Sequence, residues 1–325
     1  MLQRETAGDP ARMKRALDGL RKYQETPRNS PPAPMSSLAV VEGASLRDYG
    51  GSGPPVLFVP SLINPPTVLD LSPERSLLRW LSGRGHRVLL LDWGWPDEAR
   101  KRLSVSGHIE QILVPMIAAI GEPVALVGYC LGGTMAVAAA RIAPTRALAT
   151  LAAPWHFAGF PDDARRDLAA LWHQWRPSAD ALGLLPMEAL QSAFWSLDPG
   201  RTIAKFEAFA GFSGAEAETF VTLEDWANDG PPLSGAAARQ LFEDFFAADL
   251  PGSGGWTAGD TSIDPEAISV PMLHIVSTSD RIVPHASAIR AGGRLDLAQG
   301  HVGMVVGSRA QQILWEPLAD WLAGV

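Results

Sequence analysis

Apolar residues in the first half of the chain fall into short continuous runs, separated by segments with helical spacing. The runs are too short for helices and are bounded by Pro and Gly, so they predict buried strands. They are VLFVP (56–60), RVLLLDW (87–93), VALVG (124–128) and ALATLAA (147–153). Helices are predicted between and after them at 76–82, 107–120 and 134–142. Continuous rather than alternating apolar strands are typical of a parallel sheet covered on both faces, which is the α/β class.

This strand–helix alternation stops after residue 154. Residues 155–268 are rich in Trp, Phe, Ala and Leu at helical spacing and show no clear strand. Strands resume at 272–277 and 294–298, and a last helix is expected over 309–322. We therefore predict a core of residues 36–154 and 269–325 with a helical cap, 155–268, inserted over the carboxyl edge of the sheet. Ligands bind at that edge in open α/β sheets.

The first 35 residues are expected to form an N-terminal arm. A basic amphipathic segment runs from Arg12 to Tyr23, and TPRNSPPAPMS (26–36) has the composition of a linker. Such an arm either packs on the surface of the domain or binds a partner as a helix. Packing on the surface is the favoured interpretation.

Composition narrows the classes of function. The 325 residues are 46% hydrophobic and 19% charged, which is ordinary for a globular protein. A formal net charge of −8 disfavours nucleic-acid binding. The single cysteine excludes an internal disulfide, and no apolar run resembles a signal peptide or a transmembrane segment, so a cytoplasmic location is expected.

The strongest local motif is LVGYCLGGT (126–134), in which Cys130 occupies the centre of a Gly-x-nucleophile-x-Gly pattern. A predicted strand precedes it and a predicted helix follows, which is the setting that a nucleophile elbow requires. The glycines allow strand and helix to approach around a strained turn. The helix N-terminus favours a thiolate. The alternative is a buried structural cysteine, which the strand–elbow–helix context disfavours.

A cysteine nucleophile needs a base and a group that orients the base. In folds that carry their nucleophile on such an elbow, the catalytic residues follow one another along the chain in the order nucleophile, acid, histidine. Asp280 follows the strand 272–277, and His301 follows the strand 294–298 between two nearby glycines. Both are predicted to lie with Cys130 at the strand ends. His274 is expected in the core, whereas His86 and His173 are interpreted as surface or helix residues.

An oxyanion hole needs two backbone donors. The N–H of Leu131, the residue after the nucleophile, is one candidate. The second should come from the loop PSLINPP (60–66), where Ile63 is the choice. A simple proline-rich turn is an equally good interpretation of that loop. No metal site and no cofactor is predicted.

Several segments together resemble the polyhydroxyalkanoate synthases, in particular the short class that works with an accessory subunit. The segments are VPSLINPPTVLDL (59–71), LLLDWGWPDEA (89–99), GYCLGGT (128–134), LEDWANDG (223–230), STSDRIVP (277–284) and GHVGM (300–304). The resemblance covers about residues 55–325 and implies an α/β-hydrolase fold. It makes Cys130 the acylated nucleophile, Asp280 the acid and His301 the base.

The resemblance implies an acyltransferase that polymerises (R)-3-hydroxyacyl-CoA through an acyl-cysteine, with coenzyme A entering only as part of the substrate. It also implies a homodimer or a complex with an accessory subunit, and the surface of polyester granules as a further location. The arm and the alanine-rich cap depart from the family pattern, and the chain is shorter than most synthases. A thioesterase or intracellular polyester depolymerase with the same triad, and a non-catalytic granule-binding protein, remain alternatives. GYCLGG also resembles dienelactone hydrolase, but the long insertion before Asp280 disfavours that assignment.

Overall fold

The fold is organised around one eight-stranded sheet. The computed structural model describes residues 2–28 and 34–325, and the remaining positions belong to the predicted arm and linker. The strand order is β1-β2-β6-β3-β7-β8-β13-β14, in which β2 runs antiparallel to both neighbours and all other pairs are parallel. The strands are β1 Ser37–Val41, β2 Ala44–Asp48, β3 Pro55–Val59, β6 Arg87–Asp92, β7 Val124–Tyr129, β8 Thr145–Leu151, β13 Met272–Ser277 and β14 Gly293–Leu297.

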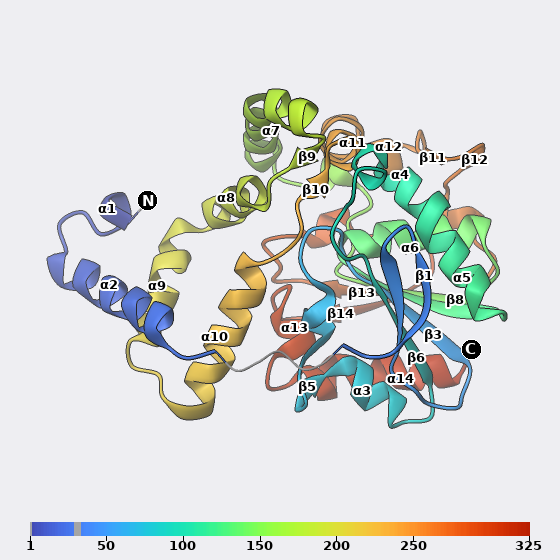
Figure 1. Cartoon of the computed structure of the whole chain (residues 1–325), viewed down its shortest axis with the longest axis horizontal. Helices are drawn as coiled ribbons and strands as arrows, with labels where there is room; N and C mark the ends of the chain where they lie inside the picture. The colour runs from blue at the N-terminus through green and yellow to red at the C-terminus, as the bar shows by residue number, and fades with distance from the viewer. Residues whose placement is uncertain (1, 29–33) are drawn as a thin grey trace.

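Helices cover both faces of the sheet, and each face has its own apolar core (Figure 1). Alternate residues of β3 show this, because Leu57 and Val59 face one core while Val56 and Phe58 face the other. On the first face lie α4 Val105–His108, the π-helical turn η3 Ile109–Leu113, α5 Val114–Ile120 and α6 Leu131–Ile142. On the second lie α3 Leu77–Ser82, α13 Gly303–Val306, the π-helical turn η8 Gln311–Trp315 and α14 Glu316–Ala323. The predicted α/β class is confirmed.

The strands and core helices expected from periodicity are confirmed within a few residues at their ends. The hairpin β1–β2 and the short helix α13 were not predicted. Three of the five residues of β1 are exposed, so this edge strand lacks the continuous apolar run that marks the central strands. Strand β2 alternates in burial, as a strand near the edge of a sheet does, but it is only five residues long.

Residues between β8 and β13 are mainly helical and extend to one side of the sheet (Figure 1). The helices are α7 Asp162–Leu182, α8 Met187–Leu197, α9 Pro199–Phe209, α10 Gly214–Asn228, α11 Gly235–Arg239, the π-helical turn η5 Gln240–Ala247 and α12 Leu250–Ser253. Two-residue strands β9 Leu184–Leu185 and β10 Leu233–Ser234 pair within this region, which sequence periodicity had not indicated. The boundaries of the cap at residues 155 and 268 stay a prediction.

Short elements complete the chain. They are η1 Pro66–Leu69, β4 Asp70–Ser72, β5 Arg75–Ser76, η2 Arg100–Arg102, η4 Phe157–Gly159, β11 Thr257–Ala258, β12 Thr261–Ser262, η6 Pro265–Ala267 and η7 His285–Ser287. Within the described ranges, no helix is both long enough and apolar enough to cross a bilayer.

The N-terminal segment packs against the cap rather than against the sheet. It contains α1 Leu2–Glu5 and α2 Pro10–Glu25, and α2 lies along α9 (Figure 1). Asp9 caps α2 by accepting a 2.8 Å hydrogen bond from the N–H of Arg12, and Pro10 begins the helix. At Gly19 the two helices touch so closely that an added Cβ would lie 1.8 Å from the carbonyl oxygen of Phe206. A surface-packed arm, the favoured interpretation of the sequence, is therefore what the structure has.

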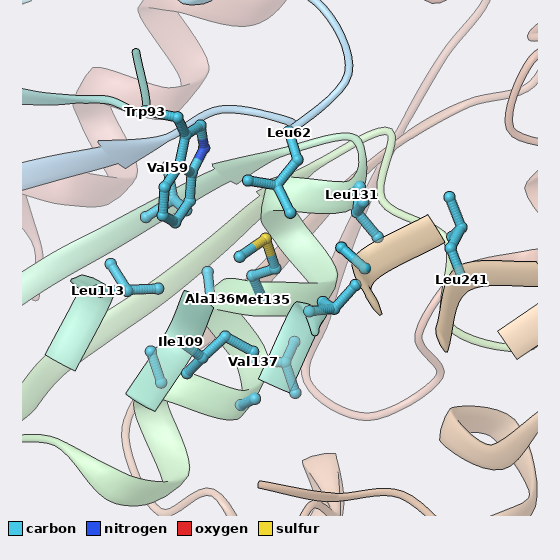
Figure 2. Close-up of a cluster of buried hydrophobic side chains, with 14 of the residues drawn as sticks. Val59, Leu62, Trp93, Ile109, Leu113, Leu131, Met135, Ala136, Val137 and Leu241 are labelled. Carbon is cyan, nitrogen blue, oxygen red and sulfur yellow. The ribbon is translucent and has the colours of Figure 1, made fainter. Parts of the chain in front are cut away.

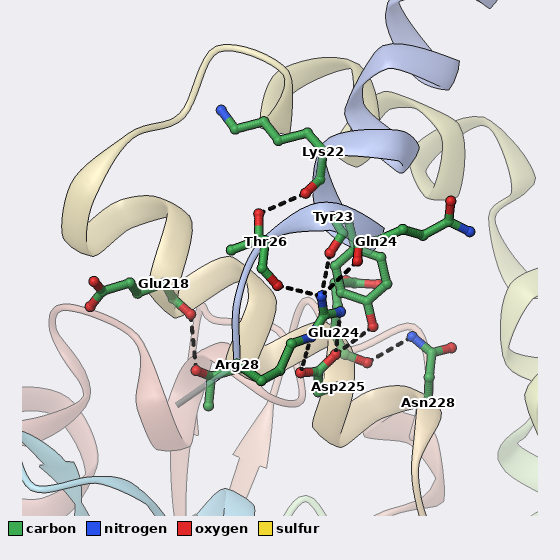
Figure 3. Close-up of polar contacts among 10 residues, drawn as sticks. Lys22, Tyr23, Gln24, Thr26, Arg28, Glu218, Glu224, Asp225 and Asn228 are labelled. Atoms are coloured by element: carbon green, nitrogen blue, oxygen red, sulfur yellow. Dashed lines mark hydrogen bonds and ion pairs between the residues drawn. The ribbon is translucent and has the colours of Figure 1, made fainter. Parts of the chain in front are cut away.

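Polar contacts hold both ends of α2 to the cap, and Figure 3 shows those near its C-terminal end. Near the start of the helix, Arg12 pairs with Glu207 of α9 at 2.9 Å. Near its end, the hydroxyl of Tyr23 donates to Asp225 of α10 at 2.6 Å, and Arg28 reaches both oxygens of the same carboxylate at 3.0 Å. Bidentate pairs of this kind fix geometry as well as adding energy.

Gly19→Ala should release the arm from the cap, because the new methyl group collides with backbone rather than with a flexible side chain. We expect trypsin to cleave after Arg21 and Lys22 at least several times faster than in the unmodified protein, with the core melting transition little changed. Gly324→Ala is the control, because its Cβ would lie 3.5 Å from the nearest atom. Equal cleavage rates in the two variants would contradict the packing described here.

Candidate active site

Cys130 occupies a strained turn between β7 and α6. Its φ is 55° and its ψ −130°, in the left-handed half of backbone space that residues with a side chain seldom adopt. The N–H of Cys130 donates to the carbonyl of Leu151 on β8, at 2.9 Å, which ties the turn to the sheet. Strain of this kind is held by the surrounding structure and is common at functional sites.

Three glycines permit this turn. An added Cβ at Gly128 would lie 2.4 Å from the Cα of Gly133, so strand and helix could not approach as they do. One at Gly132 would lie 2.1 Å from the carbonyl oxygen of Val59, the last residue of β3. The glycines of GYCLGG are thus explained by contact distances, and they place Cys130 at the carboxyl edge of the sheet.

Asp280 lies in the loop after β13 and is fixed by its own loop. Its Oδ1 accepts hydrogen bonds from the N–H groups of Ile282, at 2.7 Å, and Val283, at 3.0 Å. Its Oδ2 accepts from Nδ1 of His301 at 2.6 Å, and the Asp280 side chain is completely buried. The carboxylate therefore determines both the position of the imidazole and which of its nitrogens carries the proton.

His301 lies between Asp280 and Cys130. It follows β14, its side chain is 7% exposed, it hydrogen-bonds with Asp280, and it lies close enough to Cys130 for the two groups to interact electrostatically. Burial lowers the pKa of His301, but the electrostatic interaction with Cys130 and the hydrogen bond to Asp280 outweigh it, so the pKa of His301 lies above its usual value. The structure thus brings together the three residues predicted as a triad, while their catalytic roles stay predictions.

The two predicted oxyanion donors lie in different environments. Leu131 is the first residue of α6, so its N–H has no acceptor within the helix. Ile63 lines the same cavity as Cys130, but its N–H donates to the hydroxyl of Ser61 at 3.1 Å. The role predicted for Ile63 therefore requires the Ser61 side chain to turn away when substrate binds.

The remaining histidines lie outside this cluster. His274 is buried in β13 and hydrogen-bonds with Thr150 at 2.8 Å, as expected of a core residue. His173 is exposed on α7. The interpretation of His86 as a surface or helix residue was wrong, because it is only 8% exposed and precedes β6. Burial of His86 could not be predicted from its neighbours, because they are glycines and arginines.

A cavity of about 190 Å³ opens onto Cys130 and His301. Its inner wall comes from the sheet edge and its outer wall from helices α8, α9 and α10. Trp226 of α10 fixes the two walls to each other by donating from Nε1 to the carbonyl of Pro65, at 2.8 Å. Across the described residues, no cluster of three His, Cys, Asp or Glu side chains is arranged to hold a metal ion.

Two aromatic residues that support the site were not identified from the sequence. Tyr129 packs on the imidazole of His301, with ring centroids 5.0 Å apart, and donates to the His301 carbonyl at 3.2 Å. Trp93 donates to the carbonyl of Pro60 at 3.0 Å and packs with Val59 and Leu62 near the start of α6 (Figure 2). Tyr129 lies in GYCLGGT (128–134) and Trp93 in LLLDWGWPDEA (89–99), two of the segments that carry the family resemblance. Their place in these segments is the sequence signal that could have identified them.

Comparison with known proteins agrees with this geometry. Residues 56–314 match the model of the alpha/beta hydrolase family. The chain belongs to the alpha/beta hydrolase family. Solved members share the fold at low sequence identity. A putative non-heme bromoperoxidase, BpoC, from Mycobacterium tuberculosis has a TM-score of 0.55 at 15% identity over 88% of this chain and 97% of that one. Alpha/beta hydrolase GrgF from Penicillium has a TM-score of 0.55 at 17% identity, and the match covers 89% of this chain and 97% of that one.

Among family members, the chain is similar to curated proteins named poly(3-hydroxyalkanoate) polymerase subunit PhaC. It is 29% identical to the Haloferax mediterranei protein over 83% of this chain, but spans only 58% of that protein's length. It is 29% identical to the Allochromatium vinosum protein over 82% of this chain and 80% of that one, and 29% identical to the Synechocystis protein over 83% and 77%. The predicted resemblance to polyhydroxyalkanoate synthases is confirmed.

Replacing Cys130 should lower the pKa of His301. In Cys130→Ala the electrostatic interaction with the cysteine, which raises the pKa of His301, is gone, whereas the burial that disfavours the protonated ring remains. Titration of the His301 ring protons by nuclear magnetic resonance should therefore show the pKa falling relative to the unmodified protein. Cys130→Ser is the matched control for side-chain size and should lower the pKa in the same direction. Identical titration curves for His301 with and without Cys130 would refute the proposed pairing.

Proposed function

We propose that the chain is a polyhydroxyalkanoate synthase-like acyltransferase, which polymerises (R)-3-hydroxyacyl-CoA through a covalent acyl-cysteine at Cys130. The main support is the cluster of Cys130, His301 and Asp280 at the floor of a cavity that the cap covers. The similarity to proteins named PhaC supports the same substrate class. We place the enzyme in the cytoplasm and at polyester granules, as a homodimer or with an accessory subunit.

The first half-reaction forms the acyl-enzyme. His301 takes the proton from the Sγ of Cys130, and the thiolate attacks the thioester carbonyl of the substrate. The N–H of Leu131 stabilises the tetrahedral oxyanion, joined by that of Ile63 once Ser61 has turned away. The carbon–sulfur bond to coenzyme A then breaks, and His301 returns the proton to the departing thiol. Asp280 holds the imidazolium in place throughout.

The second half-reaction forms the ester bond. His301 removes the proton from the hydroxyl of the next hydroxyacyl unit or of the growing chain, and the oxygen attacks the acyl-cysteine. The Cys130 thiolate leaves and is reprotonated by His301. Water in place of the alcohol would yield a free hydroxy acid, so the cap has a physical role in excluding it. With one cysteine in the chain, two thiols at one site could come only from two subunits.

Incubation with 3-hydroxybutyryl-CoA tests the proposal, with coenzyme A release followed by thiol titration and the product divided into polymer and free acid. Cys130→Ala should abolish release, and His301→Ala should reduce it on the order of 10³-fold or more, because triad members act as a unit. His173→Ala, an exposed histidine on α7, is the matched control and should retain activity. Substantial release by Cys130→Ala would exclude it as the nucleophile.

The ratio of products separates the two catalytic alternatives. A synthase gives insoluble polyester with little free acid. A thioesterase gives free acid in proportion to coenzyme A from the first turnover. The assay is to be run with and without any accessory subunit. If free acid forms in equal amount to coenzyme A under both conditions, the chain is a thioesterase that uses the same triad, and the synthase proposal is wrong.

A further inference from the structure

A second and larger cavity lies between the N-terminal arm and the cap. Its volume is about 430 Å³, and its lining is mainly apolar. One wall is a stripe on α2 formed by Ala16, Leu20 and Tyr23, at the spacing that places residues on one helix face. The facing wall includes Ile203 and Phe206 of α9. We call this space the arm groove.

The arm groove adjoins the Cys130 cavity. Five residues line both spaces, so the two are separated only by shared side chains. These residues are Gln191, Trp195, Thr202, Lys205 and Asn228. They form the boundary between the two spaces, which we call the junction.

The groove is hollow because of the way the arm is attached. Polar anchors hold α2 at both ends, through Arg12 and Tyr23, and Gly19 sets the close contact with α9. Between these points the leucines do not close on the cap, and Leu17 remains 45% and Leu20 36% exposed. Apolar side chains that line an open channel rather than a packed core are typical of ligand-binding sites.

The junction is more polar than the groove. Lys205 pairs with Glu224 at 2.6 Å, and the amide of Asn228 donates to the carbonyl of Glu224 at 2.7 Å. An ammonium carries three donors and an amide nitrogen two, so these groups retain donors beyond the contacts described. A chain that presents ester carbonyls at intervals could accept hydrogen bonds at the junction and place its apolar carbons in the groove.

We propose that the arm groove binds the growing oligo(hydroxyacyl) chain, with α2 as its outer wall. The proposal rests on the function proposed above, because it takes the chain on Cys130 as the occupant. The N-terminal arm then becomes part of the substrate-binding surface. The inner cavity of 190 Å³ holds the reacting unit, and the groove of 430 Å³ holds units already joined.

Binding to the inactive full-length Cys130→Ala protein tests this without acyl transfer. The probes are a fluorescently labelled 3-hydroxybutyrate trimer methyl ester and the equally labelled monomer ester, measured by fluorescence anisotropy. The trimer should bind at least about tenfold more tightly than the monomer, since it buries additional apolar surface. Leu20→Trp should fill the groove and weaken trimer binding about tenfold.

Two further variants make the result decisive. Leu17→Trp changes a half-exposed position on the same wall and should weaken trimer binding without unfolding α2, which circular dichroism verifies. Leu182→Trp adds the same bulk at an exposed position of α7 outside the groove and should leave trimer affinity unchanged. Equal trimer affinity in all three variants, or equal affinity for monomer and trimer, would overturn the proposal.

The test separates this inference from the proposed function. Trimer binding that both groove variants weaken supports the groove even if the unmodified protein releases no coenzyme A from 3-hydroxybutyryl-CoA. The converse result is polymer synthesis that depends on Cys130 while trimer affinity is the same in Leu17→Trp and Leu20→Trp as in their parent protein. That result would support the proposed function and refute chain binding in the arm groove.

Discussion

The close approach of strand β7 to helix α6 is the constraint on which the site depends. Only glycine fits at positions 128 and 132, because a methyl group at either would overlap backbone atoms of α6 or β3. This approach places Cys130 in a backbone conformation that is unfavourable for any residue with a side chain. The local cost is offset by two apolar cores that fix β7 from both faces of the sheet. The nucleophile is thus positioned by backbone packing, whereas its partners are positioned by loops.

One segment of the cap links the separate parts of the molecule. In LEDW, Glu224 pairs with Lys205, Asp225 anchors the arm through Tyr23 and Arg28, and Trp226 bonds to the loop after β3. Consecutive residues on a helix point in different directions, so three neighbours can contact three different elements. A change in this segment would disturb the cavity, the junction and the arm together.

The sequence predicted the central sheet well because continuous apolar runs between helical segments leave few alternatives. It also located Cys130, Asp280 and His301, since each follows a strand in the order that the fold requires. It did not predict β1, whose exposed edge positions carry no clear pattern. Nor could it show that the arm packs at Gly19 on α9, because that contact joins two helices that are distant along the chain. The hydrogen bond from the N–H of Ile63 to the Ser61 hydroxyl is local, but it depends on the conformation of a loop, which the pattern of apolar residues does not determine.

The attachment of the arm depends on ion pairs that are partly open to water. Arg28 and Asp225 are each 36% exposed, and Arg12 and Glu207 are 29% and 17% exposed. Dissolved ions screen such pairs much more than they weaken the apolar core, and the screening length shortens from about 10 Å at 0.1 M to about 3 Å at 1 M. Ionic strength therefore acts on the arm selectively, and concentrated salt would loosen α2 while leaving the sheet and the Cys130 turn intact.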